Sequence, residues 1–472
     1  MATDKVRACA RKIVAFHDRF ASCFGRSEAR NHARVYLQGL ILAEGRKNVE
    51  RIALRFAEGP QGEPPGANEV VALQEFLTLS PWRASQVQRE IQAVFAEELV
   101  PSCSQWSLGT VGVVDESSFI KSGSESCGVK RQWCGRLGKE ENCQVGVFLV
   151  GVTPAGTGLL DHQLYLPQEW AQDAARRKKT RVPKDVAFQT KPQIATQQIR
   201  RTRAGGHVKF DWITADEGYG RNGDFLDALE ADGQRYVVET AVNTSVWTKD
   251  PSTQTHEWCG NGRPPTNPLR DSVLSVKAIA EALPAEAWRV LQLREGAKGP
   301  LAFQFAAVRV WAMRHHKPGP PIWLVIRRSL AAKPETKYYV SNADEHTSLE
   351  TMALVTGTRW RVEEFFEDGK GDFGMSDYEA RAWTSWHHHM SLVALAHLFI
   401  TTTRHELHED LPELTLPMAL QLMQATMNRP TLTETDAIRL TEYHLHRNRV
   451  ARDSHRKSWK QRHKGIKPQT LL

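Results

Sequence analysis

The sequence predicts an α/β protein, in which a mixed sheet flanked by helices follows a helical segment and is interrupted by a mainly β segment. Three observations predict this class. Apolar residues recur at helical spacing through about the first hundred residues, apolar strands alternate with helical stretches as far as residue 240, and helical periodicity returns after residue 355. The chain has 472 residues, enough for two or three domains and at least one large buried core.

Residues 1–104 are predicted to be helical. The helical period runs through RKIVAFHDRF and ARVYLQGLILAEG and, after a Pro/Gly-rich break, through VVALQEFLTLS and ASQVQREIQAVFAEELV. A small helical bundle is the simpler interpretation of this segment. The cations of GRKNVERIALRF allow a second one, a bundle that presents basic helices to DNA; they are Arg46, Lys47, Arg51 and Arg55.

Residues 105–240 have the texture of an α/β domain. TVGVVDESSF, QVGVFLVGVT and GLLDHQLYLP are expected to be strands, and residues 185–204 are expected to be a helix. HVKFDWITADEGYG is then a buried strand that ends in an acidic turn, NGDFLDALEADG a helix and QRYVVETAV one more strand. This alternation predicts a mixed sheet that begins as a meander.

The remainder of the chain falls into three parts. Residues 241–355 alternate Pro/Gly-rich stretches with β-rich runs such as FQFAAVRVWAM and PIWLVIRRSL, which predicts a mainly β insertion. Residues 356–440 are expected to be helical, from TRWRVEEFFEDGKGDFG onward. Residues 441–472 are strongly basic, and we expect them to fray into a tail.

Composition indicates a globular protein with an anionic partner. Hydrophobic residues make up 41% and charged residues 25%, with a formal net charge of +8. No apolar run reaches membrane-spanning length, and the N-terminus has no signal-peptide core, so we expect a cytoplasmic protein with no membrane partner. The seven cysteines, an odd number, fit reduced thiols better than a disulfide framework.

Two carboxylates lie at the C-terminal ends of apolar strands, Asp115 in VGVVDESSF and Asp216 in DWITADEGYG. An acid at a strand end is placed at a sheet edge, where a site can form. Carboxylates that converge from separate elements are what Mg²⁺ requires, and two such ions support phosphoryl transfer. Taken alone, each aspartate is better explained as a turn or helix-capping acid, and only the two together make a metal site an equal interpretation.

A third element favours the metal site. Arg359, Glu363 and Lys370 are spaced Arg-x3-Glu-x6-Lys, which puts all three on about one face of a helix. Such a face offers a carboxylate for an ion and cations for DNA phosphates. A solvated amphipathic helix with Glu/Lys pairs is the alternative, but it explains less well the apolar residues crowded into RWRVEEFF.

This stretch resembles the Tyr-Arg-Glu-Lys signature of DDE transposases of bacterial insertion sequences, whose RNase H-like domain carries a β-strand insertion. The Arg, Glu and Lys of the signature fall on the three residues just named, and Thr356 stands in place of the Tyr. Other blocks resemble one subgroup in the right order: DESSFIKSG with GVKRQWCGRLGKEENCQVGVFLVG, LYLPQEW, ITADEGYG, DYEARAWTSWHHHMSLVALAHLFI and NRVARDSHRKSWK. LQEFLTLSPW and GRKNVERIA resemble its N-terminal region, so the likeness extends along most of the chain.

The resemblance implies an RNase H-like mixed sheet flanked by helices, with a helical N-terminal DNA-binding domain and a mainly β insertion. It implies a triad of Asp115, Asp216 and Glu363 that binds two Mg²⁺ ions, for which Mn²⁺ can substitute. The activity would be cleavage at terminal inverted repeats and strand transfer, by a homodimer on paired double-stranded DNA ends at the bacterial nucleoid. Many relatives with the insertion cut through a DNA hairpin.

Other acids compete for the ligand positions. Glu364 neighbours Glu363, which is preferred because it alone keeps the spacing of the signature. Glu116 and Glu217 each lie beside one of the aspartates and are second-choice ligands, because neighbouring residues on an extended strand point to opposite sides.

Four further residues are candidates for DNA contact. Lys121, Lys130 and Arg131 follow the first aspartate, where cations would meet phosphate oxygens. Trp247 follows a strand of the insertion and is a candidate to stack a flipped base, as family members with the insertion do, although a buried tryptophan is the simpler interpretation.

Three alternative functions compete with a transposase. The first is a domesticated relative that binds DNA without cutting it, and the second is a metal-dependent nuclease without strand transfer. The third is a zinc-bearing DNA-binding protein built on Cys127, Cys134 and Cys143, with Cys103 nearby. Their spacing is not of the paired Cys-x2-Cys kind and no His lies close by, so buried thiols are the better interpretation.

Overall fold

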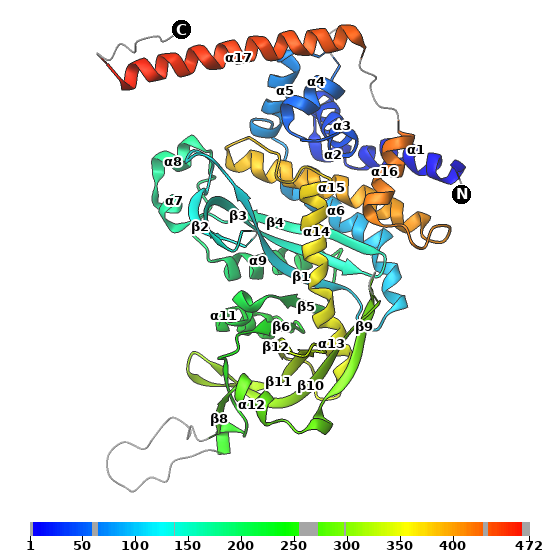
Figure 1. The fold of residues 1–472 in the computed structure, drawn as a ribbon, viewed down its shortest axis with the longest axis vertical. Coiled ribbons are helices and arrows are strands. Elements are labelled where there is room, and N and C mark those ends of the chain that lie inside the picture. The colour runs from blue at the N-terminus through cyan, green and yellow to red at the C-terminus, as the bar shows by residue number, and fades with distance from the viewer. Residues whose placement is uncertain are drawn as a thin grey trace.

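The computed structural model describes residues 3–58, 65–135, 137–253, 272–296, 299–427 and 433–464. Figure 1 shows an elongated molecule in which helices gather at one end, a β-sheet forms the other end, and a second sheet lies between them with the helix α14 along it. Across the described ranges, no helix combines the length and the apolar character that crossing a bilayer requires.

The central sheet has five strands in the order β2-β3-β1-β5, with β4 also beside β3. β1 is antiparallel to β3 and parallel to β5, and a parallel bridge from Ile213 to Tyr236 joins β5 to the beginning of β6. The strands are β1 (Val111–Ile120), β2 (Lys130–Cys134), β3 (Lys139–Thr153), β4 (Gly156–Leu164) and β5 (Trp212–Ala215).

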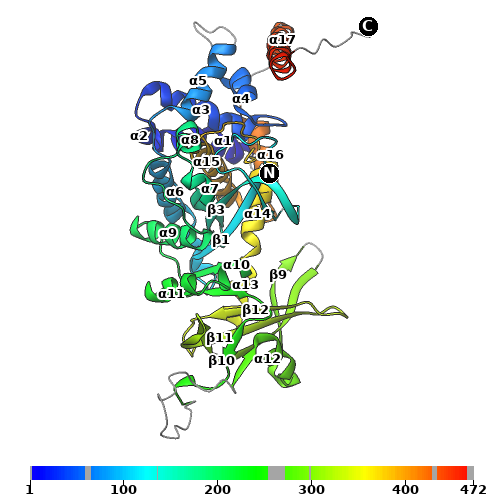
Figure 2. The ribbon, with the colours of Figure 1, turned by 90° about the vertical axis from the view of Figure 1, so that its left-hand side faces the viewer.

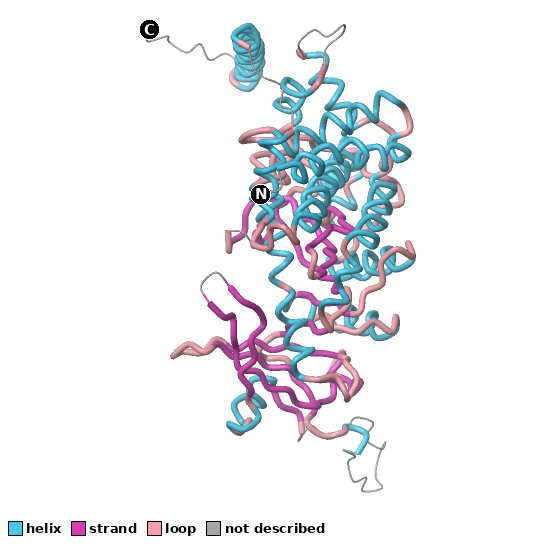
Figure 3. The backbone as a smooth tube through the Cα atoms, turned by 90° about the vertical axis from the view of Figure 1, so that its right-hand side faces the viewer, coloured by secondary structure: helices cyan, strands magenta, loops and turns pink. Residues whose placement is uncertain are grey.

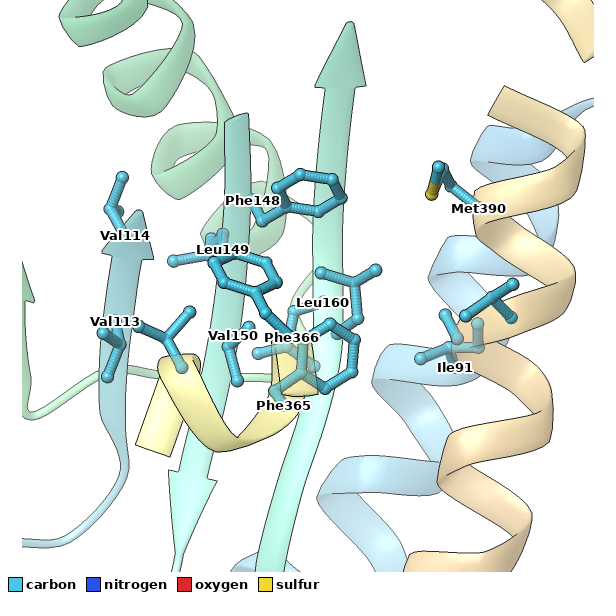
Figure 4. Packing of buried hydrophobic residues seen from close by; sticks show 14 of the residues in the cluster. Ile91, Val113, Val114, Phe148, Leu149, Val150, Leu160, Phe365, Phe366 and Met390 are labelled. Carbon is cyan, nitrogen blue, oxygen red and sulfur yellow. The ribbon is translucent and has the colours of Figure 1, made fainter. Parts of the chain in front are cut away.

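Helices cover both faces of this sheet, which explains why β3 is buried without alternation from Cys143 to Thr153. Figure 2 shows α9 (Lys191–Ala204) and α14 (Trp360–Gly371) on opposite sides. In Figure 4, Phe365 and Phe366 of α14 point to the strands, and Met390 of α15 (Trp383–Leu407) and Ile91 approach from the side of β4. The ring centroids of Phe148 and Phe366 are 5.2 Å apart, so α14 is fixed on β3 by aromatic packing.

Helices make up the described part of the N-terminal segment, which precedes the central sheet. Its helices are α1 (Thr3–Arg19), α2 (Ala21–Phe24), α3 (Ser27–Leu42), α4 (Val49–Phe56), α5 (Ala67–Thr78) and α6 (Ala84–Glu98), followed by a 3₁₀ turn (Val100–Gln105). α15 packs against α1, α3, α5 and α6, and their apolar residues form one continuous core with the central sheet. His388 joins the parts: its Nδ1 lies 2.9 Å from the carbonyl oxygen of Leu77 and its Nε2 2.8 Å from that of Trp82.

The second sheet is formed mainly by the segment predicted to be a β insertion. Its strands follow the order β6-β12-β11-β10-β7-β8, with β9 beside β10. They are β6 (Val237–Thr240), β7 (Ser245–Trp247), β8 (Val273–Ser275), β9 (Arg289–Gly296), β10 (Gly299–Arg314), β11 (Lys317–Ser329) and β12 (Thr336–Ser341). Because β6 bridges to β5 and also pairs with β12, it connects the two sheets.

The remaining helices lie between and after the strands. They are α7 (Gln168–Gln172), α8 (Ala174–Lys179), α10 (Glu217–Gly220), α11 (Gly223–Ala231), α12 (Val276–Ala282), α13 (Leu349–Thr358), α16 (Leu416–Thr426) and α17 (Glu434–Arg462), with short 3₁₀ turns at Pro251–Thr253 and Ala285–Ala287. All but the last two of these helices precede α14, so both sheets are interleaved with helices along the chain.

The expectation that residues 441–472 fray is wrong for most of that stretch, because α17 continues to Arg462. A capping box explains where the helix starts: the hydroxyl of Thr433 accepts from the backbone N–H of Asp436, and the Asp436 carboxylate accepts from the backbone N–H of Thr433. The Arg, Lys and Leu residues that follow favour a helix. Residues 465–472 lie outside the described ranges.

Substituting Gly220 with Ala is expected to destabilise the fold by about 1–3 kcal/mol through overpacking. Helix α10 crosses β6 so closely that a Cβ on Gly220 would lie 1.9 Å from the carbonyl oxygen of Glu239, a backbone atom that has little room to move. The measurement is the free energy of unfolding in urea. Gly123→Ala is the control, because a Cβ added to Gly123 would have no heavy atom within 4 Å, and equal losses in the two variants would contradict the prediction.

Candidate active site

Asp115 and Asp216 lie side by side at the edge of the central sheet. The parallel pairing of β1 with β5 ends at Val114 and Ala215, so the next residue on each strand is the aspartate. Because the aspartates follow a pair of residues that lie opposite each other, they are at the same position along the two strands. The strands are about 4.8 Å apart, so the two carboxylates lie close together. Burial and, secondly, the charge of Asp216 raise the pKa of Asp115 to about 7, because two close carboxylates in a desolvated site resist ionisation.

Asp216 ends a strand and also caps a helix. Its carboxylate accepts hydrogen bonds from the backbone N–H groups of Gly218 at 2.9 Å and Tyr219 at 3.4 Å, at the start of α10. Burial raises the pKa of Asp216, and these hydrogen bonds oppose the rise. The capping interpretation of this acid is therefore correct, and the cap orients the carboxylate at the sheet edge.

Arg359 connects the first aspartate with Glu363. It lies at the junction of α13 and α14, where its guanidinium is 3.4 Å from the carboxylate of Asp115 and 2.6 Å from that of Glu363. Its side chain is only 20% exposed and that of Asp115 is 16% exposed, so the ion pair between these two residues is shielded from solvent more than surface pairs are. Arg359 thus contacts both Glu363, one helical turn away, and Asp115 on β1.

Glu363 and its neighbour Glu364 point to different surroundings. Glu363 is 57% exposed and faces Arg359. Glu364 pairs with Arg361 at 3.2 Å and lines a cavity of about 680 Å³ together with Asp368 and Arg404. The two glutamates therefore have different surroundings on α14, and Glu363 is the one that shares Arg359 with Asp115.

A fourth carboxylate, that of Glu239 on β6, belongs to the same site. It lies 3.7 Å from Arg359 and 3.0 Å from the ammonium group of Lys337 on β12. Lys337, Glu239 and Arg359 therefore form a chain of charges from the second sheet to Asp115. Glu239 was not among the residues predicted from the sequence. The signal was present, because QRYVVETAV is an apolar strand that ends in an acid, as are the strands before the two aspartates.

The second-choice acids point elsewhere. Glu116 follows Asp115 on β1 and therefore faces the opposite side of the sheet, where it pairs with Lys191 and lies 3.5 Å from the hydroxyl of Tyr219. Glu217 lies in the first turn of α10 rather than on a strand, and it pairs with Arg221 at 3.3 Å.

The cations predicted to contact DNA differ in what they contact. Lys370 is 5.5 Å from the ring centroid of Phe119. Lys121 donates to the carbonyl oxygen of Tyr378 at 3.0 Å and lies 3.5 Å from its ring centroid, and burial, reinforced by Arg46, lowers its pKa to about 8.

Two further predicted cations are neighbours on β2. Lys130 forms an ion pair with Glu169 at 2.6 Å, and Arg131 is exposed. Because neighbouring residues alternate on a strand, the two side chains point to opposite faces of the sheet. Only one of them can face the side on which the aspartates lie.

Trp247 is buried, with 1% of its surface exposed. It lies on β7, where it is paired with Trp311 of β10 and with Val273 of β8. Packing between two strands leaves the indole no face open to a base in this arrangement. The predicted role of Trp247 in base stacking therefore has no exposed indole surface to act through in this structure.

The residues of the site suit a hard divalent cation in their chemistry. Carboxylate oxygens are the ligands that Mg²⁺ prefers, and a cation between Asp115 and Asp216 would relieve the repulsion that raises the pKa of Asp115. Within the described ranges, no group of three or more His, Cys, Asp or Glu side chains stands close enough to hold a metal ion, since Glu363 reaches Arg359 instead.

The cysteines of the central sheet are buried free thiols. Cys134 and Cys143 pack with Val145 beside the partly buried Tyr165, and Cys127 is buried nearby. Burial raises the pKa of Cys127 to about 12, which keeps it a thiol rather than a metal-binding thiolate. This environment favours a packing role for the cluster.

The chain matches the family described as DDE superfamily endonuclease over residues 19–300, and it belongs to that family. The match includes both aspartates and ends before Glu363. The observed mixed α/β fold is consistent with a nuclease of this family.

The chain is also similar to a protein of Microchaete diplosiphon described as "Probable transposase for insertion sequence element IS701", with 29% identity over 184 residues. The aligned region covers 38% of this chain and 42% of that protein, so the chain spans less than half of its length. The family predicted from the sequence is confirmed.

Proposed function

We propose that the protein is a DDE transposase, which binds the terminal inverted repeats of an insertion sequence, cleaves DNA and performs strand transfer. The proposal rests on the arrangement of Asp115, Asp216 and Glu363 around Arg359 at the edge of the central sheet. The strand order and the mixture of antiparallel and parallel pairings support an RNase H-like fold. The similarity to a probable insertion-sequence transposase supports the same activity.

Asp115, Asp216 and Glu363 are the residues that would hold two Mg²⁺ ions. When bound, such ions activate an attacking water or 3′-hydroxyl and stabilise the leaving oxygen in phosphoryl transfer. The cap at Asp216 and the buried position of Asp115 fix two ligands in advance, which reduces the reorganisation needed at the site. Glu363, exposed on α14, would turn from Arg359 to the site, and Arg359 would then pair with a DNA phosphate and with Glu239.

Double-stranded DNA is the proposed partner. The net charge of +8 and the basic helix α17 suit a polyanion, and contacts to phosphates would be independent of sequence. We infer that a homodimer acts on paired ends at the bacterial nucleoid, as the resemblance to insertion-sequence transposases implies. We also propose the division into a DNA-binding segment 1–104, a catalytic domain formed by 105–240 and 356–440, and an insertion, 241–355.

With Mg²⁺, the protein is expected to nick and then join labelled DNA that carries the terminal repeat, and with a chelator it is expected only to bind it. Denaturing gels detect the nicked strand, and native gels detect complexes and joined products. Restoring activity with Mn²⁺ after chelation would agree with carboxylate ligands.

Two other outcomes of the same assay separate the alternatives. Binding without cleavage in Mg²⁺ and in Mn²⁺ would favour a domesticated relative that acts only through binding. Cleavage without joined products would favour a metal-dependent nuclease. Failure to bind the DNA would contradict all three functions.

A further inference from the structure

The hairpin formed by β2 and β3 extends the central sheet past the candidate active site. β5 ends at Ala215, level with the aspartates, whereas β1 continues to Ile120 and the hairpin continues beyond it. Figures 2 and 3 show this hairpin and the β9–β10 hairpin projecting to the same side of the molecule, and Figure 1 shows β2 and β9 on opposite sides of α14. A duplex at the aspartates would therefore run along one or both hairpins.

One face of the β2–β3 hairpin continues the face that carries Asp115. Asp115 pairs with Phe148 of β3, and Trp133 of β2 pairs with Glu140 of the same strand. Since Phe148 and Glu140 are an even number of residues apart and the register between them has no shift, their side chains share a face, and so do those of their partners. Trp133 is thus on the same face of the sheet as Asp115. Closer to the candidate active site, α14 covers this face.

Trp133 is unusual among the tryptophans of the chain because it is 61% exposed. Every other tryptophan within the described ranges is buried or partly buried. A large aromatic side chain held on a regular strand in water loses hydrophobic stabilisation and favours association with a partner. Its position on an ordered hairpin also means that contact with a partner requires little ordering.

The cations near Trp133 favour an anionic partner on this face. Acidic residues lie there as well, so the contact would not be purely electrostatic. Arg131 is exposed on the same face, two residues away, and Lys139 is exposed at the tip. Glu140 lies directly opposite Trp133, and Lys130, on the other face, is paired with Glu169. Glu141 forms an ion pair with Lys139 at 3.6 Å, and the charge of Arg131 also helps to lower the pKa of Glu141. An exposed Arg beside an indole fits one phosphate and one aromatic contact.

The distance along the sheet sets where such a contact would fall. From Phe148 to Glu140 the strand extends about 26 Å at roughly 3.3 Å per residue. With a rise of about 3.4 Å per base pair, this corresponds to about seven or eight base pairs of duplex DNA.

We propose that Arg131 and Trp133 form a second DNA contact, in which Arg131 binds a phosphate and the indole of Trp133 stacks on a base or deoxyribose about seven or eight base pairs from the cleaved phosphodiester. The inference rests on the proposed function, because it takes the duplex to lie at Asp115. The contact would hold the DNA in line with the active site and supply affinity without chemistry.

Trp133→Ala is expected to weaken binding to a fluorescein-labelled duplex of about 40 base pairs roughly tenfold, as loss of one stacking contact does, whereas Trp133→Phe retains most of the affinity. Fluorescence anisotropy measures the Kd. Val14→Ala is the control, because Val14 is 58% exposed on α1, far along the chain from the hairpin. Thermal unfolding should be unchanged in all three variants, since Trp133 is on the surface.

Substituting Trp133 with the photocrosslinker p-benzoylphenylalanine locates the contact. Crosslinks are expected about seven or eight base pairs from the phosphodiester that the parent protein cleaves in Mg²⁺. Equal affinity of Trp133→Ala and the parent, or crosslinks scattered along the duplex, would overturn this inference and leave the proposed function intact. A parent protein that neither binds nor cleaves the duplex would overturn both.

Discussion

Replacing Asp115 or Asp216 with Asn is expected to lower the rate of DNA cleavage by at least about a thousandfold. Each aspartate would hold an ion whose stabilisation of the transition state is worth several kcal/mol, and each 1.36 kcal/mol is a factor of ten in rate. The fold should tolerate both substitutions, because Asn has the shape of Asp and the Asn amide oxygen can still accept the hydrogen bonds from Gly218 and Tyr219. Single-turnover cleavage of labelled terminal-repeat DNA measures the effect.

DNA binding by the same variants should be unchanged or slightly tighter, because a neutral amide repels phosphates less than a carboxylate does. Glu363→Gln is expected to match the aspartate variants in its loss of cleavage. Glu364→Gln is its matched control, because Glu364 has different surroundings on α14, paired with Arg361. Cleavage at the parent rate by Asp115→Asn or Asp216→Asn would reject the triad, and a larger loss in Glu364→Gln than in Glu363→Gln would reassign its third member.

The position of the aspartates was predictable from the sequence, because an apolar strand that ends in an acid is a local pattern. Their adjacency was not, since it depends on β5 pairing in parallel with β1 across about a hundred residues of chain. Pairing at this distance is determined by packing of the whole sheet rather than by local preference. For the same reason, the place of Glu239 in the site could not be predicted. Its strand pattern is visible in the sequence, but its neighbours Lys337 and Arg359 come from distant parts of the chain.

The candidate DNA contacts show a second limit. Sequence alone grouped Lys130 with Arg131, but the register of β2 against β3 puts them on opposite faces. A buried Trp247 was the simpler interpretation of the sequence and is observed at 1% exposed, whereas nothing in the sequence singled out Trp133, which is 61% exposed on a short strand. Exposure depends on which strands and helices cover each face, which is a tertiary property.

The helix α17 leads to the second prediction. Its contacts to the rest of the chain include a hydrogen bond from Arg439 to the carbonyl oxygen of Pro65, one from Tyr443 to Glu50, and an ion pair of Arg447 with Glu50. All residues from His444 to Ser458 are exposed. With 100° per residue, the face opposite these anchors carries a stripe of cations, namely Arg449, Arg452, Arg456 and Lys460.

A chain that ends after Arg447 keeps the three anchors and loses eight Lys and Arg residues against one Asp. If the stripe contacts about four phosphates, the slope of log K against log salt should become less steep by about 3.6, and affinity for duplex DNA at low salt should fall roughly a hundredfold. Anisotropy titrations at several salt concentrations measure both quantities. Cleavage at saturating protein should be unchanged, because the triad lies on the central sheet.

Two full-length variants separate the effect of charge from that of length. Replacing the four cations of the stripe with Ala keeps a strong helix former at each position and should reproduce most of the change in slope. Replacing Ser454, Ser458 and Gln461, on the anchored side of the helix, with Ala should leave the slope unchanged. If the truncated chain and the parent have the same slope, α17 does not contact DNA phosphates. If the truncated chain loses affinity but the stripe variant does not, the helix acts through something other than these four charges, such as contact with a second copy of the chain.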